Sequence, residues 1–172
     1  LREAKKISHH EGLSAQFILN DAREMSFNGE FDAAYNLFTS FGYFRSHSEN
    51  LRVLSAIYRA LRKGGSFLLD TFNTPWVRRY YERQQWEELQ NGVILFKENT
   101  LRASVLKSRW IVRSGARRRE YISSIHAYER QDIESFLERV GFEITSCFGN
   151  LDGERYRSRD SRRLVLLARR PQ

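Results

Sequence analysis

Apolar residues recur at three- and four-residue spacing between residues 49 and 63, and this spacing predicts an amphipathic helix. Ser46 and Glu49 stand at its start with the spacing of a capping box, in which each side chain bonds a free amide of the first turn. Gly64 follows the stretch and can adopt the left-handed conformation that ends many helices. The pattern therefore predicts one helix with a defined start and end.

Short apolar runs flank this helix and predict buried strands. Residues 31–38 form one run, before a loop that contains Gly42, and residues 66–69 form the other. A strand, a crossover helix and a second strand make a parallel βαβ unit. The run Gln16–Asn20 predicts a further short strand. The residues before it, 1–10, are expected to form the last part of a helix.

At Pro75 the spacing of apolar residues changes from the helical period to alternation with polar residues, and this alternation continues to about Tyr128. The alternation predicts three extended segments, with a hairpin turn near Ser114–Gly115. A helical face returns at residues 133–140, and two strands are expected after it, ending with the apolar run at 164–168.

This order divides the chain into two expected units. Residues 1–75 and 129–172 form an α/β core, a partial Rossmann-like sheet with helices on both faces. Residues 76–128 form an antiparallel β insertion.

Composition narrows the function classes. The chain has 172 residues, of which 41% are hydrophobic and 29% charged, as in an ordinary globular protein. No apolar run has the length of a membrane span, so a membrane association is not expected. Cys147 is the only cysteine, no metal-ligand spacing occurs, and a cytoplasmic protein without a metal is expected.

The net charge of +8 comes mostly from arginine, with one cluster at Arg117–Arg119. A basic face can bind nucleic acid or an acidic substrate. No nucleic-acid-binding motif accompanies the charge, so a solvated basic surface is the favoured interpretation.

Polar or aromatic residues follow three of the predicted strands, at Asn20–Ala22, Asn36–Tyr43 and Asp70–Asn73. Ligands of open α/β sheets bind beyond the carboxyl ends of the strands. These three segments are therefore expected to line one rim that holds a ligand.

The chain resembles the class I S-adenosylmethionine (SAM)-dependent methyltransferases that act on small molecules. The resemblance rests on FDAAYNLFTSFGYF (31–44), LRKGG (61–65) and LLDTFN (68–73), and on YERQDIESFLERVGF (128–142) followed by RRLVLLARRP (162–171). It implies SAM as cofactor and a small molecule as methyl acceptor. It also implies that the insertion covers the substrate.

The resemblance assigns the cofactor site. Asp21 matches the acidic residue that accepts a hydrogen bond from the adenine amino group, and the amide of Ala22 would meet a ring nitrogen. Residues after the second predicted strand match those that line the methionine end. The implied cofactor-binding residues are Asp21, Ala22, Arg23, Asn36, Leu37, Phe38 and Phe41.

The resemblance also points to residues around the transferring methyl group. Aromatic faces are suited to a sulfonium because they tolerate a cation. The expected substrate-binding residues are Thr39, Ser40, Gly42, Asn73, Trp76 and Trp110. A general base is needed if the acceptor is protonated, and the expected catalytic residues are Tyr43, His126 and Tyr128.

The sequence departs from the family at its start. The glycine-rich loop after the family's first strand and the acidic residue that binds the ribose hydroxyls have no counterpart. We therefore expect a family member without its N-terminal strands, inactive as this chain alone and binding SAM weakly or not at all.

Two other classes remain open. A non-catalytic methyltransferase-like module could use its basic surface to bind nucleic acid or an acidic partner, and the missing cofactor loop favours it. A different α/β nucleotide-binding enzyme, such as a dehydrogenase, is disfavoured because no phosphate-binding glycine loop is present. A homodimer would satisfy the unpaired sheet edge that missing strands leave.

Overall fold

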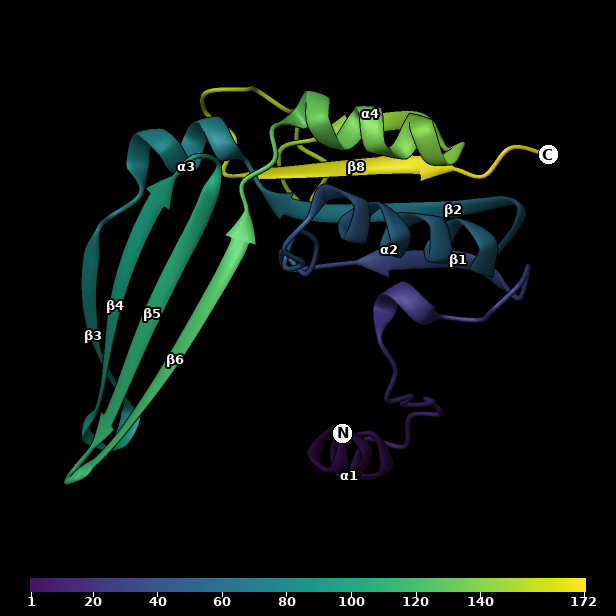
Figure 1. The fold of residues 1–172 in the computed structure, drawn as a ribbon. Coiled ribbons are helices and arrows are strands. Elements are labelled where there is room, and N and C mark those ends of the chain that lie inside the picture. Colours follow the sequence, from purple (N-terminus) through teal and green to yellow (C-terminus); the bar gives the residue numbers. More distant parts are fainter.

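The computed structural model describes residues 1–172 and contains two four-stranded β-sheets (Figure 1). The strands of the first sheet are, in spatial order, β1 (Phe31–Asn36), β2 (Leu61–Phe72), β8 (Arg163–Arg169) and β7 (Glu143–Phe148). β1 and β2 are parallel, whereas β8 is antiparallel to both of its neighbours. This sheet and its helices confirm the predicted α/β, Rossmann-like fold class.

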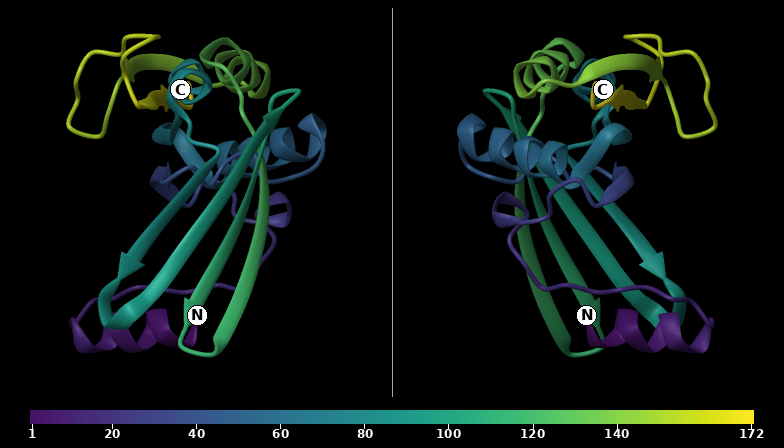
Figure 2. Two further views of the ribbon diagram at one scale, coloured as in Figure 1. Left: turned by 90° about the vertical axis from the view of Figure 1, so that its left-hand side faces the viewer. Right: turned by 90° about the vertical axis from the view of Figure 1, so that its right-hand side faces the viewer.

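Two helices pack on the first sheet, α2 (His47–Ala60) and α4 (Arg130–Val140), and both lie on the same face rather than on both faces as expected (Figures 1 and 2). Their apolar faces and the sheet enclose the main core. Fully buried members of that core are Leu54, Phe67, Leu69, Leu137 and Leu166. Each such side chain contributes about 1.5–3 kcal/mol by leaving water, so this packing is what fixes the helices against the sheet.

The capping box predicted at the start of α2 is confirmed. The Ser46 hydroxyl accepts a hydrogen bond from the Glu49 amide, and the Glu49 carboxylate accepts one from the Ser46 amide. α4 ends as predicted at Gly141, which is left-handed with φ 108°.

The end of α2 differs from the prediction. The helix stops at Ala60, and β2 begins at once because Leu61 is extended and pairs with β1. Gly64, with φ 77°, lies inside β2, so its predicted role as the helix end is wrong. Arg170 stabilises the end of the helix instead, because its Nη1 donates to the carbonyl oxygens of Tyr58 and Leu61.

Residues before β1 form α1 (Arg2–His10) and a single turn, η1 (Ala22–Glu24). The strand predicted at Gln16–Asn20 is wrong. This segment pairs with no strand, and Leu19 is 88% exposed. A strand here needs a neighbour to bond its backbone groups, and β1 pairs only with β2. β1 is therefore an open edge, and its residues Phe31 and Tyr35 are exposed.

The second sheet is entirely antiparallel and extends away from the first (Figures 1 and 2). Its strands, in order, are β3 (Gln84–Leu89), β4 (Val93–Arg102), β5 (Val105–Ser114) and β6 (Arg117–His126). The hairpin predicted at Ser114–Gly115 is present. β3 was not among the three predicted segments because all six of its residues are exposed and carry little apolar alternation.

The two sheets meet at α3 (Thr74–Tyr80) and at the end of β6. Thr74 donates from its hydroxyl to the carbonyl oxygen of Tyr128, at 2.6 Å, and the Ala127 amide donates to the carbonyl oxygen of Ser104 in the β4–β5 turn. The first bond ties the second sheet to the rim of the first, and the second bond extends the pairing of β5 with β6. The division of the chain into a core and an inserted unit stays a prediction.

No helix combines the length and the apolar character that crossing a membrane requires. No three histidine, cysteine or acidic side chains come together as metal ligands would.

Candidate functional site

The loop between β1 and α2 lies at the carboxyl end of β1, on the rim where a ligand was predicted. Two successive residues in it, Phe38 and Thr39, have left-handed backbones, with φ 55° and 62°. Neither is glycine, so this conformation is strained. Phe38 is exposed, as expected for a residue that faces a ligand, and the Ser40 hydroxyl bonds back to the carbonyl oxygen of Leu37.

Asp70 on the neighbouring strand β2 holds this loop. Its carboxylate is fully buried and accepts a hydrogen bond from the Phe38 amide at 2.8 Å. Its main-chain carbonyl oxygen accepts one from the Thr39 amide at 3.1 Å. Arg163 at the start of β8 donates to both carboxylate oxygens, at 2.5 and 2.7 Å, and to the Thr39 hydroxyl at 3.2 Å.

Asn36, the last residue of β1, carries a buried side-chain oxygen that no hydrogen-bond donor meets. Buried polar atoms are rarely left without a partner, and an exception asks for an explanation. A ligand that donates a hydrogen bond at the end of β1 would satisfy this atom.

Two of the predicted rim residues face the protein rather than a ligand. Phe41, expected at the cofactor, is buried in the core with its ring 5.7 Å from that of Tyr128. Gly42, expected at the substrate, is buried and left-handed at φ 104°, and a Cβ there would lie 3.1 Å from the His126 carbonyl oxygen. Gly42 thus lets the loop pass close to the end of β6. The predicted contacts of Phe41 with the cofactor and of Gly42 with the substrate are untested, and the burial of both residues disfavours them.

Asp21 and Arg23 form a network at η1 rather than standing free. The Asp21 carboxylate accepts from the Arg23 amide at 2.9 Å and from its guanidinium at 2.6 Å, and Arg23 also pairs with Glu49. These hydrogen bonds from Arg23 lower the pKa of Asp21 to about 2. The guanidinium stacks on the Phe44 ring, 4.3 Å from its centroid, while Ala22 packs against the main core.

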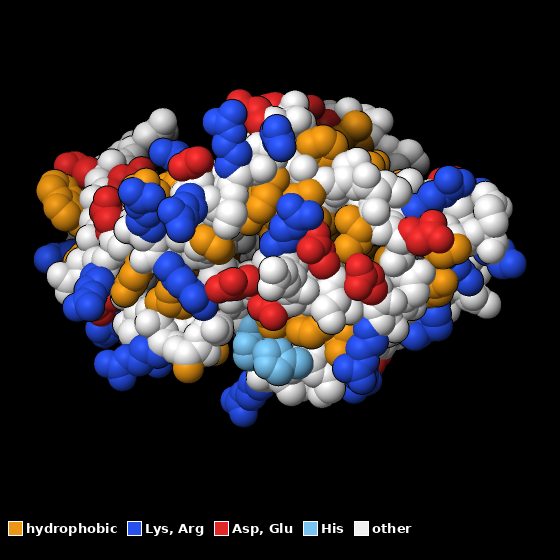
Figure 3. Space-filling model, turned by 90° about the horizontal axis from the view of Figure 1, so that it is seen from above, with side chains coloured by type: hydrophobic (Ala, Val, Ile, Leu, Met, Phe, Trp, Pro, Cys, Tyr) orange, Lys and Arg blue, Asp and Glu red, His pale blue; other side chains and the backbone are white.

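Two of the three predicted catalytic residues lie together in a pocket between the two sheets. This junction pocket has a volume of about 710 Å³. Its lining comes from the start of α2, the β4–β5 turn, the end of β6 and α4, and consists of His47, Ser48, Leu51, Ala103, Ser104, His126, Ala127, Tyr128, Asp132, Phe136 and Arg139. Figure 3 shows histidine side chains together at the edge of a hollow, with acidic side chains beside them.

Hydrogen bonds fix the polar groups of the junction pocket. Asn50 Nδ2 donates to the Tyr128 hydroxyl at 3.1 Å, and that hydroxyl lies 2.9 Å from His47 Nδ1. Burial raises the pKa of Tyr128 to about 12. His126 Nε2 lies 3.0 Å from the carbonyl oxygen of Arg45. A carbonyl only accepts, so Nε2 of His126 carries a proton.

The other predicted site residues are dispersed. Tyr43, the third catalytic candidate, is exposed on the rim loop. Asn73 is 1% exposed, and its amide bonds Ser158, Ser161 and Tyr156 within the protein. Its predicted substrate contact is thus disfavoured by the geometry.

The two predicted tryptophans lie on different elements. Trp76 is on α3 beneath the Arg162 guanidinium, with 5.3 Å between that group and its ring centroid. Trp110 is half exposed on β5, where it pairs with Tyr121 and carries Lys97 over its ring. Ile125 lies on the same face of the second sheet, by the two-residue alternation from Tyr121, and would touch a Cβ at Gly42. Trp110 therefore shares a face with a residue that reaches the rim.

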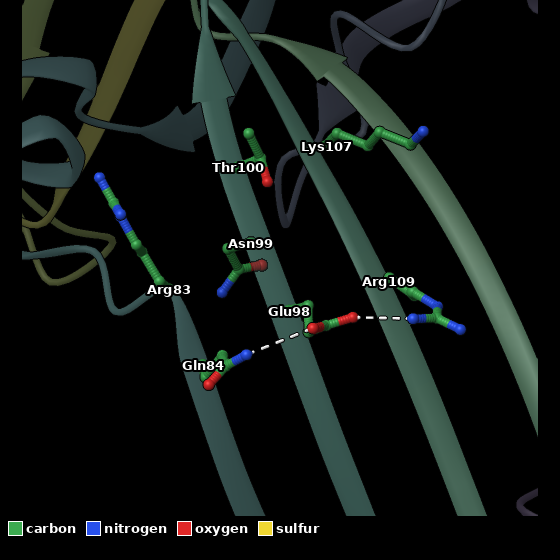
Figure 4. A pocket seen from close by; sticks show the side chains of 7 residues that line it. All are labelled: Arg83, Gln84, Glu98, Asn99, Thr100, Lys107 and Arg109. Atoms are coloured by element: carbon green, nitrogen blue, oxygen red, sulfur yellow. Dashed lines mark hydrogen bonds and ion pairs between the residues drawn. The ribbon is translucent and has the colours of Figure 1, made fainter.

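A second pocket, of about 580 Å³, lies on the second sheet (Figure 4). Its lining is wholly polar and consists of Arg83, Gln84, Glu98, Asn99, Thr100, Lys107 and Arg109. Glu98 is bonded by Gln84 on one side and by Arg109 on the other. This pocket could not be predicted from the sequence, because its residues meet only through the register of β3, β4 and β5.

Comparison with known proteins identifies the fold. No protein-family model and no curated protein sequence matches the chain. Among solved structures it is similar to a SAM-dependent methyltransferase from Clostridium acetobutylicum, with a TM-score of 0.87 and 18% identity over 99% of this chain and 71% of that one.

Two sugar-modifying enzymes are also similar. The sugar N-methyltransferase KedS8 from Streptoalloteichus has a TM-score of 0.71 and 17% identity, covering 98% of this chain and 68% of that one. CalS10 from Micromonospora echinaspora, an amino pentose methyltransferase solved with SAM bound, has a TM-score of 0.63 and 20% identity, covering 88% and 63%. The chain therefore has the fold of SAM-dependent methyltransferases and spans about two thirds of the length of these proteins.

Proposed function

We propose that the chain serves SAM-dependent methyl transfer to a small molecule. The observation that supports it is the buried, unpartnered oxygen of Asn36 at the carboxyl end of β1, in a chain with this fold. Ligands of such sheets bind at that end of the strands. The amino group of SAM is a charged donor, which is what a lone amide oxygen requires.

The residues present fit the cofactor at several points. Asn36 Oδ1 would accept from the amino group, and Leu37 and Phe38 would line the methionine end. The Asp21 carboxylate keeps acceptor capacity beyond its bonds to Arg23, because a carboxylate has about four lone-pair sites. When bound, SAM supplies a methyl group activated by a sulfonium charge.

We propose that the acceptor lies between the rim loop and the face of the second sheet that carries Trp110. This assignment gives the second sheet the role of a cover and gives the exposed Tyr43 access to the acceptor. Two of the similar enzymes are described as an amino pentose methyltransferase and a sugar N-methyltransferase, so a polar small molecule is the class of acceptor that we favour.

His126 could take a proton only from an acceptor that reaches the junction pocket. Its side chain lines that pocket and, by the two-residue alternation along β6, lies on the face opposite Ile125 and Trp110. The Arg45 carbonyl oxygen accepts a hydrogen bond from its Nε2. A base is needed only for a protonated acceptor, such as an ammonium or a hydroxyl.

Saturation-transfer NMR with SAM tests the cofactor assignment, because it detects ligands that bind in the millimolar range. We expect a signal for the intact chain, weakened by Asn36→Leu. Asp21→Ala should also weaken the signal, because it removes the carboxylate that would accept a hydrogen bond from the adenine amino group. Asp32→Ala removes an exposed carboxylate of β1 and serves as the control. The assignment fails if SAM gives no signal, or if all three variants behave alike.

A second candidate function is a binding module for nucleic acid or an acidic partner. The polar pocket of the second sheet favours it, because Arg83 and Lys107 line the pocket with no carboxylate partner. Arg109 adds little, since Glu98 and Glu120 both pair with it. A mobility-shift titration in rising salt separates the two functions, because phosphate contacts weaken steeply with salt.

A further inference from the structure

The conformation of the rim loop needs an outside restraint. Phe38 and Thr39 both have positive φ, and Thr39 is β-branched, which makes a left-handed backbone especially unfavourable. No glycine occupies either position. Two adjacent strained residues persist only where surrounding groups hold them, and such strain gathers at functional sites.

Asp70 and Arg163 provide that restraint. The buried Asp70 carboxylate accepts a hydrogen bond from the Phe38 amide, and the Asp70 main-chain carbonyl oxygen accepts one from the Thr39 amide. Both strained residues are thus bonded to one residue of β2. Arg163 reaches the same loop from β8, through the Thr39 hydroxyl.

The pair is built as a unit across two strands. Arg163 approaches the carboxylate with two nitrogens, in the fork geometry that makes arginine–carboxylate pairs strong and directional. Asp70 has no exposed surface, and the Arg163 side chain is 30% exposed. Removing one partner would leave a buried charge without compensation, so the two residues depend on each other.

We infer that Asp70 and Arg163 are positioning residues that hold the Leu37–Tyr43 loop in its strained conformation, so that the Asn36 oxygen and Phe38 are presented at the rim. The importance of this arrangement for methyl transfer rests on the proposed function. The restraint itself rests only on the bonds described above. It assigns a role to Arg163, which the site residues expected from the sequence do not include.

Amide hydrogen exchange measured by NMR tests the restraint in the intact chain. In Asp70→Asn, an amide nitrogen replaces one carboxylate oxygen, so the two-bond fork to Arg163 is lost although one side-chain acceptor remains. If that fork restrains the loop, exchange at the Phe38 and Thr39 amides should accelerate by about tenfold or more relative to amides of β2 and β8, because their bonds to residue 70 open more often. Asp32→Asn breaks the exposed pair with Arg62 and should leave both amides unchanged.

A milder variant covers the case in which Asp70→Asn does not fold. Thr39→Val keeps the shape of the side chain and removes only the hydroxyl that Arg163 bonds. It should accelerate exchange in the loop, whereas Thr145→Val, which removes an exposed hydroxyl bonded to Leu167, should not. Acceleration shared equally by loop and sheet would show that the pair only stabilises the fold, and would overturn the inference.

SAM binding separates this inference from the proposed function. If the intact chain gives no saturation transfer from SAM, the proposed function fails, while exchange in the loop still decides the restraint. If SAM binds, variants that free the loop should lose the signal in proportion to the exchange they gain. Unchanged SAM binding in a variant with a freed loop would overturn the positioning role.

Discussion

His126 donates from its ring Nε2 to the carbonyl oxygen of Arg45, while its own amide donates to the carbonyl oxygen of Gly42. One residue at the end of the second sheet thus bonds both ends of a short turn in the rim loop. The side-chain bond also decides which ring nitrogen carries the proton.

The His126 tautomer is the first prediction. Neutral His126 should carry its proton on Nε2, because the only partner of that nitrogen is an acceptor. Nitrogen-15 shifts of the ring report the tautomer directly. His9, in the exposed α1, is the reference for an unrestrained ring. A His126 population with the proton mainly on Nδ1 would contradict both the bond and the proposed base.

Gly42→Ala should destabilise the protein strongly. The substitution places a Cβ 3.1 Å from the His126 carbonyl oxygen and forces alanine to φ 104°, so we expect a loss of about 2–4 kcal/mol, from strain and displaced packing together. Gly115→Ala is the matched control, because that glycine also has positive φ but has open space around it. Urea denaturation should show a clearly smaller loss for the control.

Asp21 should make the stability depend on acidity. Arg23 lowers the pKa of this carboxyl in the folded chain from 3.8 to about 2. The group therefore contributes stability above pH 3.8, and the contribution is lost as the pH falls through 3.8 toward 2. Asp21→Asn should flatten the stability curve in that window and leave it parallel to the original near neutrality. Thermal unfolding at a series of acidic pH values is the measurement, and an unchanged acid slope would contradict the Arg23 network.

Tyr128 should make the stability of the protein depend on pH in the alkaline range. Burial raises the pKa of its hydroxyl from 10 to about 12, so the folded protein keeps this proton after the unfolded chain has lost it. Stability falls as the pH rises between these two values. In Tyr128→Phe that fall should be smaller. The variant should also be less stable at neutral pH, by about 1 kcal/mol, because the hydrogen bonds to His47 and Asn50 are lost. Tyr43→Phe, at an exposed position, should change neither property.

The Arg117–Arg119 cluster should contribute charge rather than recognition. All three residues are exposed at the start of β6, next to the hairpin turn, and Arg118 is paired with Glu120. We expect no tight binding of nucleic acid at physiological salt in a mobility-shift titration. Tight binding that disappears when the three arginines become serine would favour the binding-module function instead.

Local signals in the sequence were sufficient for the elements around α2. The capping box at Ser46 and Glu49 depends on residues three apart, and it forms as predicted. The stop of α4 at Gly141 and the hairpin at Gly115 are equally local. In each of these places the residues that determine the local structure are close in sequence, and the tertiary contacts favour the same structure.

Features set by distant partners could not be predicted in this way. The segment Gln16–Asn20 has the composition of a strand, but pairing decides whether a strand forms. Arg163 looked like one of many surface arginines, because its partner Asp70 lies 93 positions away in the chain. The helix end at Ala60 was missed for the same reason, since the carbonyl oxygens of Tyr58 and Leu61 are bonded by Arg170, 112 and 109 positions away in the chain.

The position of β8 bears on the order in which the protein can fold during synthesis. β8 comes after every other strand in sequence, yet it lies inside the first sheet, between β2 and β7. Until it has left the ribosome, β2 and β7 each lack a neighbour, and Arg163 and Arg170 are not there to hold the rim loop and the end of α2. The nascent chain must therefore keep a gap in its sheet and carry exposed apolar strands until translation has passed β8, which is the period in which chaperones would be most needed.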